Sequence, residues 1–180
     1  MRITLILAAT ALVLTACETP TTQRYAVSAD NNQTIKAIGA TGVGIRAFGG
    51  PTSFDSTCRA LGPMQVADNM THTQYIQKAF EDELKIAGAF APVSPRVSIG
   101  GKVSRLEFSS SKGVTGGYWQ IDLNLDSSNG RKLAVSEYYE FSSGFIANDA
   151  CRNTADAYAR AVQNLVGKAF KSPLFAELLR

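Results

Sequence analysis

Apolar and polar residues follow two different periods along this chain, and each period predicts one kind of element. The clearest helix follows Thr71, which stands three residues before Gln74, the spacing of a capping box. It should end at Gly88, a residue type common just past helix C-termini. Its apolar residues recur at helical spacing: Ile76, Ala79, Phe80, Leu84 and Ala87. The charged residues on the opposite side indicate a solvated face.

The last third of the chain also has the helical period. A start near Asn153 or Thr154 leads into one apolar stripe, and Ser172-Pro173 then begins a short second helix with serine as cap and proline in the first turn. The stripe consists of Tyr158, Val162, Leu165, Val166 and Ala169. This pattern predicts a long helix that buries one side.

Strands are predicted where apolar residues alternate or turn residues close a short run. The stretches are 34–48, 58–67, 96–108, 118–126 and 132–141. Asn129-Gly130 is a strong hairpin turn between the last two, whereas Gly62-Pro63 weakens the second. The element order is thus β-β-α-β-β-β-α. It predicts an α+β fold in which two helices pack on one face of a mixed or mostly antiparallel sheet.

The N-terminus has the features of an export leader. Residues 3–14 form an apolar run behind a basic start, too short for the roughly 20 residues of a membrane-spanning helix. Leu14-Thr15-Ala16-Cys17 resembles a bacterial lipobox. That resemblance implies a signal peptide over 1–16, a diacylglycerol on the Cys17 sulfur and an acylated, palmitate-type new amine. The alternatives are an ordinary signal peptide or a buried N-terminal helix.

Behind the leader, the sequence divides into a tether and one domain. Residues 17–33 are mostly polar and aperiodic, so we expect a flexible tether that spans roughly 50 Å when fully extended. Residues 34–180 should form a single α+β domain. Hydrophobic residues make up 45% of the chain and charged residues 18%, which supports a packed core rather than disorder. Glu18 after the cysteine implies delivery to the outer membrane, by resemblance to enterobacterial sorting signals.

The chain has three cysteines, and lipidation would remove Cys17 from the count. Cys58 and Cys151 then remain in an oxidising compartment, so we predict a disulfide between them. Two separate buried thiols are the alternative. A redox pair is disfavoured because the chain lacks the C-x-x-C spacing.

Few residues suggest cofactor or metal chemistry. Gly39, Gly42 and Gly44 match no phosphate-loop motif, and close backbone packing or a bulge in a strand explains them better. His72 is the single histidine, and it lacks companion ligands at a metal-binding spacing. We therefore expect a solvent-facing histidine and no cofactor. The formal net charge of +3 is too small to indicate a nucleic-acid partner.

The predicted hairpin carries carboxylates and aromatic residues. Asp122, Glu137 and Glu140 would suit glycosidic cleavage if two of them were paired, but an exposed polar sheet face explains them more simply. Tyr118 and Tyr138 fall on the polar side of the alternation and form a candidate binding surface. Core packing is the alternative for most of these rings. Trp119 and either Tyr139 or Phe141 are expected in the core.

The order of the predicted elements, with the motifs in them, resembles that of a known protein family. The helix text Tyr75-x-x-x-Ala79-Phe80-x-x-Glu83-Leu84-x-x-Ala87-Gly88 is followed by PRVSIGGKVSRLEF, a hairpin and a long helix that ends near SPLFAELL. Over residues 34–180 this order resembles YajG-type bacterial lipoproteins. It is more distantly similar to LpoB-like outer-membrane lipoproteins, which activate a peptidoglycan synthase, but it lacks their long proline-rich tether.

Together these features predict a non-enzymatic lipoprotein, anchored through Cys17 at the periplasmic face of the outer membrane. Its domain is expected to bind or scaffold another envelope component, either a protein or peptidoglycan. One alternative is regulation of a peptidoglycan synthase by protein contact. The other is a weak peptidoglycan hydrolase.

Overall fold

A computed structural model of the protein describes residues 19–51 and 53–180. The proposed leader, Cys17 and Glu18 lie outside the described residues. The four strands are β1 (Val43–Gly49), β2 (Val97–Lys112), β3 (Gly116–Ser127) and β4 (Lys132–Ser142). They form one sheet in the order β1-β2-β3-β4, in which β1 is parallel to β2 and the other pairs are antiparallel.

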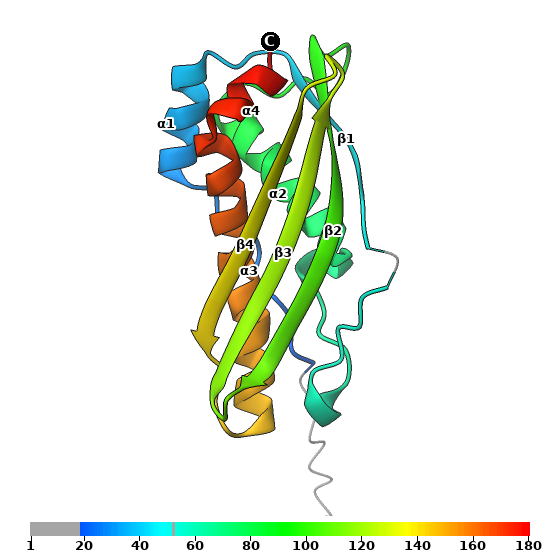
Figure 1. Cartoon of the computed structure of the whole chain (residues 1–180), viewed down its shortest axis with the longest axis vertical. Coiled ribbons are helices and arrows are strands. Elements are labelled where there is room, and N and C mark those ends of the chain that lie inside the picture. The colour runs from blue at the N-terminus through cyan, green and yellow to red at the C-terminus, as the bar shows by residue number, and fades with distance from the viewer. Residues whose placement is uncertain (1–18, 52) are drawn as a thin grey trace, which may run out of the picture.

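Four α-helices lie on one face of this sheet (Figure 1). They are α1 (Ala29–Ile38), α2 (His72–Ile86), α3 (Ala147–Lys171) and α4 (Pro173–Leu178), with short 3-10 turns η1 (Arg59–Leu61) and η2 (Ala67–Asn69) before α2. Helix α1 packs on α2 and α3. The predicted α+β fold, with a mixed sheet and helices on one face, is confirmed. No helix among the described residues is long and apolar enough to cross a membrane.

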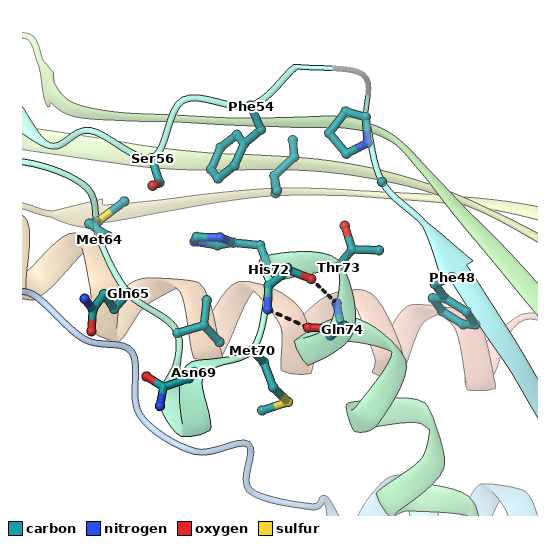
Figure 2. A pocket seen from close by; sticks show the side chains of 15 residues that line it. Phe48, Phe54, Ser56, Met64, Gln65, Asn69, Met70, His72, Thr73 and Gln74 are labelled. Atoms are coloured by element: carbon teal, nitrogen blue, oxygen red, sulfur yellow. Dashed lines mark hydrogen bonds between the residues drawn. The ribbon is translucent and has the colours of Figure 1, made fainter.

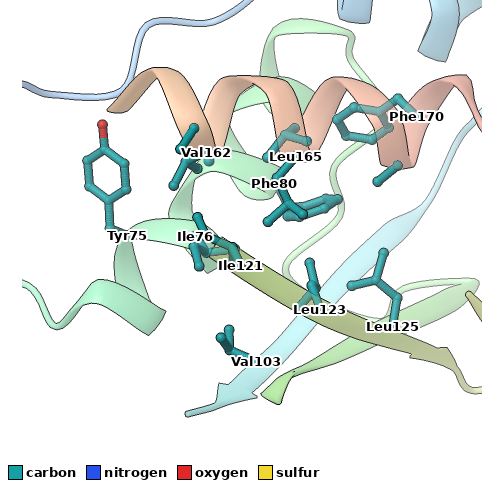
Figure 3. Close-up of a cluster of buried hydrophobic side chains, with 14 of the residues drawn as sticks. Tyr75, Ile76, Phe80, Val103, Ile121, Leu123, Leu125, Val162, Leu165 and Phe170 are labelled. Atoms are coloured by element: carbon teal, nitrogen blue, oxygen red, sulfur yellow. The ribbon is translucent and has the colours of Figure 1, made fainter. Parts of the chain in front are cut away.

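The core fills the space between the sheet and the two long helices (Figure 3). Alternate residues of β3 point into it, as the sequence predicted: Trp119, Ile121, Leu123 and Leu125. Phe80 of α2 packs against Phe170 of α3, with ring centroids 5.4 Å apart. The apolar sides of the helices and of the sheet thus form one buried layer. Burial of this apolar surface is the main driving force for folding.

The structure corrects the strand predicted over residues 34–48. Its first part belongs to α1, which begins after the N-cap Ser28 and ends at Gly39. Gly39 has φ +70°, a left-handed conformation that glycine adopts without steric cost. Only the second part forms β1. The alternation in the first part consists of only Ile35, Ala37 and Gly39, too few residues to distinguish a strand from a helix.

The tether predicted over residues 17–33 is also wrong for most of its length. The backbone of Thr22 donates a hydrogen bond to the carbonyl of Gln65 at 2.9 Å, and Arg24 forms an ion pair with Asp68 at 2.7 Å. The last residues of the range lie inside α1. These partners are more than 40 positions away in sequence, so local composition gave no sign of them.

The strand predicted over residues 58–67 is a compact loop that contains η1. Cys58 donates its backbone N–H to the carbonyl of Gly62 at 2.9 Å, which closes a tight turn. Gly62 has φ +85°, and Pro63 has no N–H to give to a sheet. The chain therefore turns where the alternation suggested extension. Helix α3 also begins at Ala147, several residues before the predicted start.

The predicted disulfide is present. Cys58 and Cys151 are both fully buried, with Cα atoms 5.7 Å apart and 93 positions between them in sequence. The bond joins the loop around η1 to the first turns of α3. It therefore links the middle of the chain to the C-terminal helix at one end of the domain.

Candidate functional site

A hollow of about 760 Å³ opens between the loop after β1 and the beginning of α2 (Figure 2). Apolar and polar side chains line it in similar measure. The apolar lining residues are Phe48, Phe54, Met64, Val66, Met70 and Leu106. The polar ones include Ser56, Gln65, Asn69, His72, Thr73 and Gln74. A hollow in which polar groups lie beside apolar ones can hold a ligand that has both kinds of surface.

The beginning of α2 is fixed by its capping box. The Thr71 hydroxyl accepts a hydrogen bond from the backbone of Gln74 at 3.1 Å, and the Gln74 side chain accepts one from the backbone of Thr71 at 2.8 Å. The capping box predicted from sequence is thus confirmed. It sets the first residue of the helix, His72, at the edge of the hollow.

The other wall comes from the end of β1. The backbone N–H of Phe48 donates a 3.0 Å hydrogen bond to the side chain of Gln77 on α2. The Phe48 ring lies directly over Gly101 of β2, where a Cβ would come within 2.7 Å of it. Gly101 therefore allows the ring to lie flat against the sheet. Through these contacts the position of the wall depends on both the sheet and α2.

His72 is buried, with 9% of its surface exposed, and the predicted solvent-facing histidine is wrong. Its ring packs against those of Phe54 and Tyr158, at centroid distances of 4.8 and 4.9 Å, and lies 6.0 Å from that of Trp119. Burial lowers the pKa of His72 to about 4, so the imidazole is neutral at neutral pH. No local pattern indicates this burial, because the three rings come from distant segments.

One nitrogen of this imidazole, Nε2, is buried and has no hydrogen-bond partner among the described residues. Figure 2 shows the ring projecting between Phe54 and Met64. An unpaired buried polar atom costs about 1–3 kcal/mol, and a partner would regain that energy only by reaching Nε2, which has almost no exposed surface. The ring neighbours among the described residues are Phe54, Trp119 and Tyr158.

Tyr118 and Tyr138 lie side by side on the face of the sheet opposite the helices. Their rings stack with centroids 5.2 Å apart, and Tyr138 is 47% exposed. Lys112 donates a 3.0 Å hydrogen bond to the Tyr138 hydroxyl and forms an ion pair with Glu140. That ion pair raises the pKa of Lys112 and lowers the pKa of Glu140. The structure thus brings the two predicted tyrosines together in one small polar and aromatic cluster.

The three hairpin carboxylates do not lie together. Glu137 is buried on the face covered by helices, where it accepts a 3.0 Å hydrogen bond from Asn164 and pairs with Lys168 at 2.5 Å. Its predicted exposure is therefore wrong. Glu140 lies on the open face, as does Asp122, because side chains alternate across a strand. Glu137 faces away from both, so it cannot complete a catalytic pair with either.

No group of three or more His, Cys, Asp or Glu side chains within residues 19–51 and 53–180 is placed to hold a metal ion. Trp119 is fully buried, and Tyr139 and Phe141 pack against the core with partial exposure. The aromatic side chains of the hairpin thus divide between the core and the open face, as the alternation predicted.

Comparison with known proteins finds only distant similarity. No protein-family model and no curated protein matches the sequence. The crystal structure of protein XCC0632 from Xanthomonas campestris, of the DUF330 family model, is 15% identical. The match covers 85% of this chain and 94% of that one, with a TM-score of 0.48. Hypothetical protein CT253 from Chlamydia trachomatis is 7% identical over 73% of this chain and 96% of that one, with a TM-score of 0.42.

Proposed function

We propose that this chain is a non-enzymatic lipoprotein, held by lipidated Cys17 at the periplasmic face of the outer membrane, whose domain binds another envelope component. The observation that carries the binding role is the hollow beside His72. It combines apolar and polar lining side chains with a buried imidazole nitrogen that has no partner among the described residues. Such a site fits an apolar group that also bears a hydrogen-bonding atom.

The chemistry of the hollow favours recognition. Phe54 and Met70 offer apolar contact, while Gln65 and Asn69 at the rim offer amide groups. His72 is neutral at neutral pH and presents one donor and one acceptor, of which Nε2 is unused. A bound group that paired with Nε2 would be held in one orientation, which provides specificity.

The stacked pair of Tyr118 and Tyr138 is the second surface that we assign to binding. Tyrosines with exposed ring area are common anchors in protein interfaces. Here the two rings support each other, and Lys112 holds the Tyr138 hydroxyl. The cluster is therefore ordered before any partner arrives, which reduces the entropic cost of binding.

In-cell crosslinking of the tagged lipoprotein, followed by mass spectrometry of the captured material, tests this proposal. Ser56→Phe places a ring in the hollow, and Ser53→Phe on the same loop is the matched control because Ser53 does not line that hollow. We expect one dominant captured component that Ser56→Phe loses and Ser53→Phe retains. Equal capture by the two variants would exclude the hollow as the binding site.

The same capture experiment tests the tyrosine surface. The double variant Tyr118→Ala/Tyr138→Ala should capture several-fold less of the same component, and full retention would remove this surface from the proposal. Failure of the wild-type protein to capture any discrete component would contradict the binding role itself.

Lipid anchoring has its own test. The wild-type protein should incorporate labelled palmitate and fractionate with the outer membrane, and Cys17→Ala should do neither. Incubation of the domain with purified sacculi should release no soluble fragments. Release of such fragments would support the hydrolase alternative instead.

A further inference from the structure

The chain is hydrogen-bonded to the rest of the domain from a position very close in sequence to the proposed lipid anchor. The carbonyl of Pro20 accepts a 2.9 Å hydrogen bond from the backbone of Gln65, and the backbone of Thr22 donates one to the carbonyl of Gln65. The Thr22 hydroxyl then accepts a 3.1 Å bond from the backbone of Ala67. From Pro20 onward the chain is therefore part of the domain.

Only three residue steps separate Pro20 from Cys17. A fully extended chain covers at most about 3.6 Å per residue, so this link spans about 11 Å. That is much shorter than the roughly 50 Å expected for a tether of 16 residues. If Cys17 carries acyl chains in the outer membrane, as we propose, the domain cannot move away from the lipid surface.

One end of the domain is the natural face for that contact. In Figure 1 the described chain begins in the lower part of the molecule, toward the end that carries η1, the β2–β3 turn and the start of α3. Four apolar side chains at this end are exposed, in three separate loops. They are Leu61 at 38%, Val114 at 66%, Phe145 at 76% and Ile146 at 65%. We call this group the loop end.

Specific bonds hold the three loops together. The Arg59 guanidinium donates to the backbone carbonyls of Ser110, Gly144 and Phe145, at 2.6, 3.1 and 2.8 Å. The disulfide between Cys58 and Cys151 ties the η1 loop to α3 beside these bonds. The exposed apolar side chains are therefore displayed by a cross-linked frame rather than by independent loops.

We propose that the loop end docks on the same lipid surface that holds Cys17, with Phe145 and Ile146 inserted at the headgroup boundary. The inference rests on the proposed lipidation of Cys17. Exposed apolar side chains that cluster on a soluble domain mark an interaction surface, and aromatic rings are favoured at the membrane boundary. Lipid is the occupant because the link of about 11 Å keeps this end beside the bilayer.

Tryptophan quenching tests the docking. The full-length lipidated protein carrying Phe145→Trp is reconstituted in phosphatidylethanolamine and phosphatidylglycerol vesicles, with or without brominated acyl chains. Val93→Trp is the matched control: Val93 is 80% exposed and lies in the loop between α2 and β2. That loop leads to Arg96, which hydrogen bonds to the carbonyl of Leu179 near the C-terminus, at the opposite end of the domain (Figure 1). Trp119 is fully buried and gives both variants the same background.

We expect brominated lipid to quench Phe145→Trp several-fold more than Val93→Trp. Val114→Trp, in the β2–β3 turn, provides a second reporter on the loop end and should behave like Phe145→Trp. Equal quenching of all three variants would overturn the docking. So would an emission shift of Phe145→Trp that depends on protein concentration in detergent alone, because a second copy would then cover the loop end.

The labelled-palmitate experiment separates the two proposals. If the protein is lipidated but Phe145→Trp and Val114→Trp are quenched no more than Val93→Trp, the docking proposal is contradicted and the proposed function is not. If Cys17 is not lipidated, both the lipid anchor and the docking proposal are contradicted.

Discussion

The hydroxyl of Tyr25 donates a 2.7 Å hydrogen bond to Glu83, a carboxylate that is fully buried on α2. The acceptor atom, Oε1 of Glu83, also accepts bonds from the backbone of Ser28 and the side chain of Asn31, both at 2.9 Å. Burial and this hydrogen bond raise the pKa of Tyr25 well above its usual range. One carboxylate thus fastens the segment before α1 to the body of the domain, which is why a stretch that reads as linker is folded.

Removing that carboxylate should release the N-terminal segment. Glu83→Ala leaves the donors of Tyr25, Ser28 and Asn31 without their acceptor, and we expect a loss of about 2–4 kcal/mol in the free energy of unfolding. Urea denaturation measures this loss. Trypsin should also cut faster after Arg24 in the variant. Glu81→Ala is the control, because it removes a partly exposed ion pair with Lys85 and one hydrogen bond from Gln77, which together should cost less than the three donors left by Glu83→Ala. Equal losses in the two variants would contradict the role of Glu83 in holding the N-terminal segment.

The disulfide should contribute strongly to stability. In the chain-entropy model a loop of 93 positions stabilises the protein by about 4 kcal/mol. Cys58→Ser/Cys151→Ser should lose that amount in denaturant unfolding, and a reductant should lower the wild-type protein to the same level while leaving the variant unchanged. Thiol labelling of the non-reduced wild-type protein should modify neither Cys58 nor Cys151. Two labelled thiols would rule out the bond.

The buried His72 should make stability fall in acid. Its folded-state pKa is about 4, against an ordinary value of 6.5, so the unfolded chain binds the additional proton between these values. The free energy of unfolding should therefore decrease as pH falls from 6.5 toward 4, by roughly 3 kcal/mol in total.

Unfolding curves at pH 7.5, 5.5 and 4.5 measure this slope. In His72→Phe, which fills the same aromatic environment without a titrating group, the slope over this interval should be shallower by that amount. An unchanged slope would show that His72 titrates normally in the folded protein.

The close contact between the Phe48 ring and Gly101 leads to a further prediction. Gly101→Ala would place a Cβ 2.7 Å from the Phe48 ring, so the ring must shift, and we expect a cost of about 1–3 kcal/mol. Gly49→Ala is the matched control in the paired strand, since its Cβ would meet Lys102 at an ordinary 3.9 Å. Thermal unfolding of both variants checks this. A similar melting temperature for the two would show that the Phe48 ring moves without cost.

The elements that the sequence predicts correctly are determined by residues that lie close together along the chain. Thr71 and Gln74 cap α2 within one turn, and Asn129-Gly130 lies in the short loop between Ser127 and Lys132 that closes the hairpin. Gly130 has φ +86°, the conformation that such a turn requires. The alternation around Trp119 also predicted which side of β3 is buried. Local geometry and a strict period therefore determined α2, β3, β4 and the face that the helices cover.

The sequence by itself thus predicted the fold class, α2 and the hairpin strands, because their physical cause is short-range periodicity. It also predicted the pairing of Cys58 with Cys151, once Cys17 was assigned to the proposed lipid anchor. Only the tertiary structure decided the environments of His72, Glu83 and Glu137. Each polar group is buried by partners from distant segments: aromatic rings around His72, donors before α1 for Glu83, and side chains of α3 for Glu137. A polar residue looks exposed in sequence until the partner that stabilises its burial is brought to it by folding.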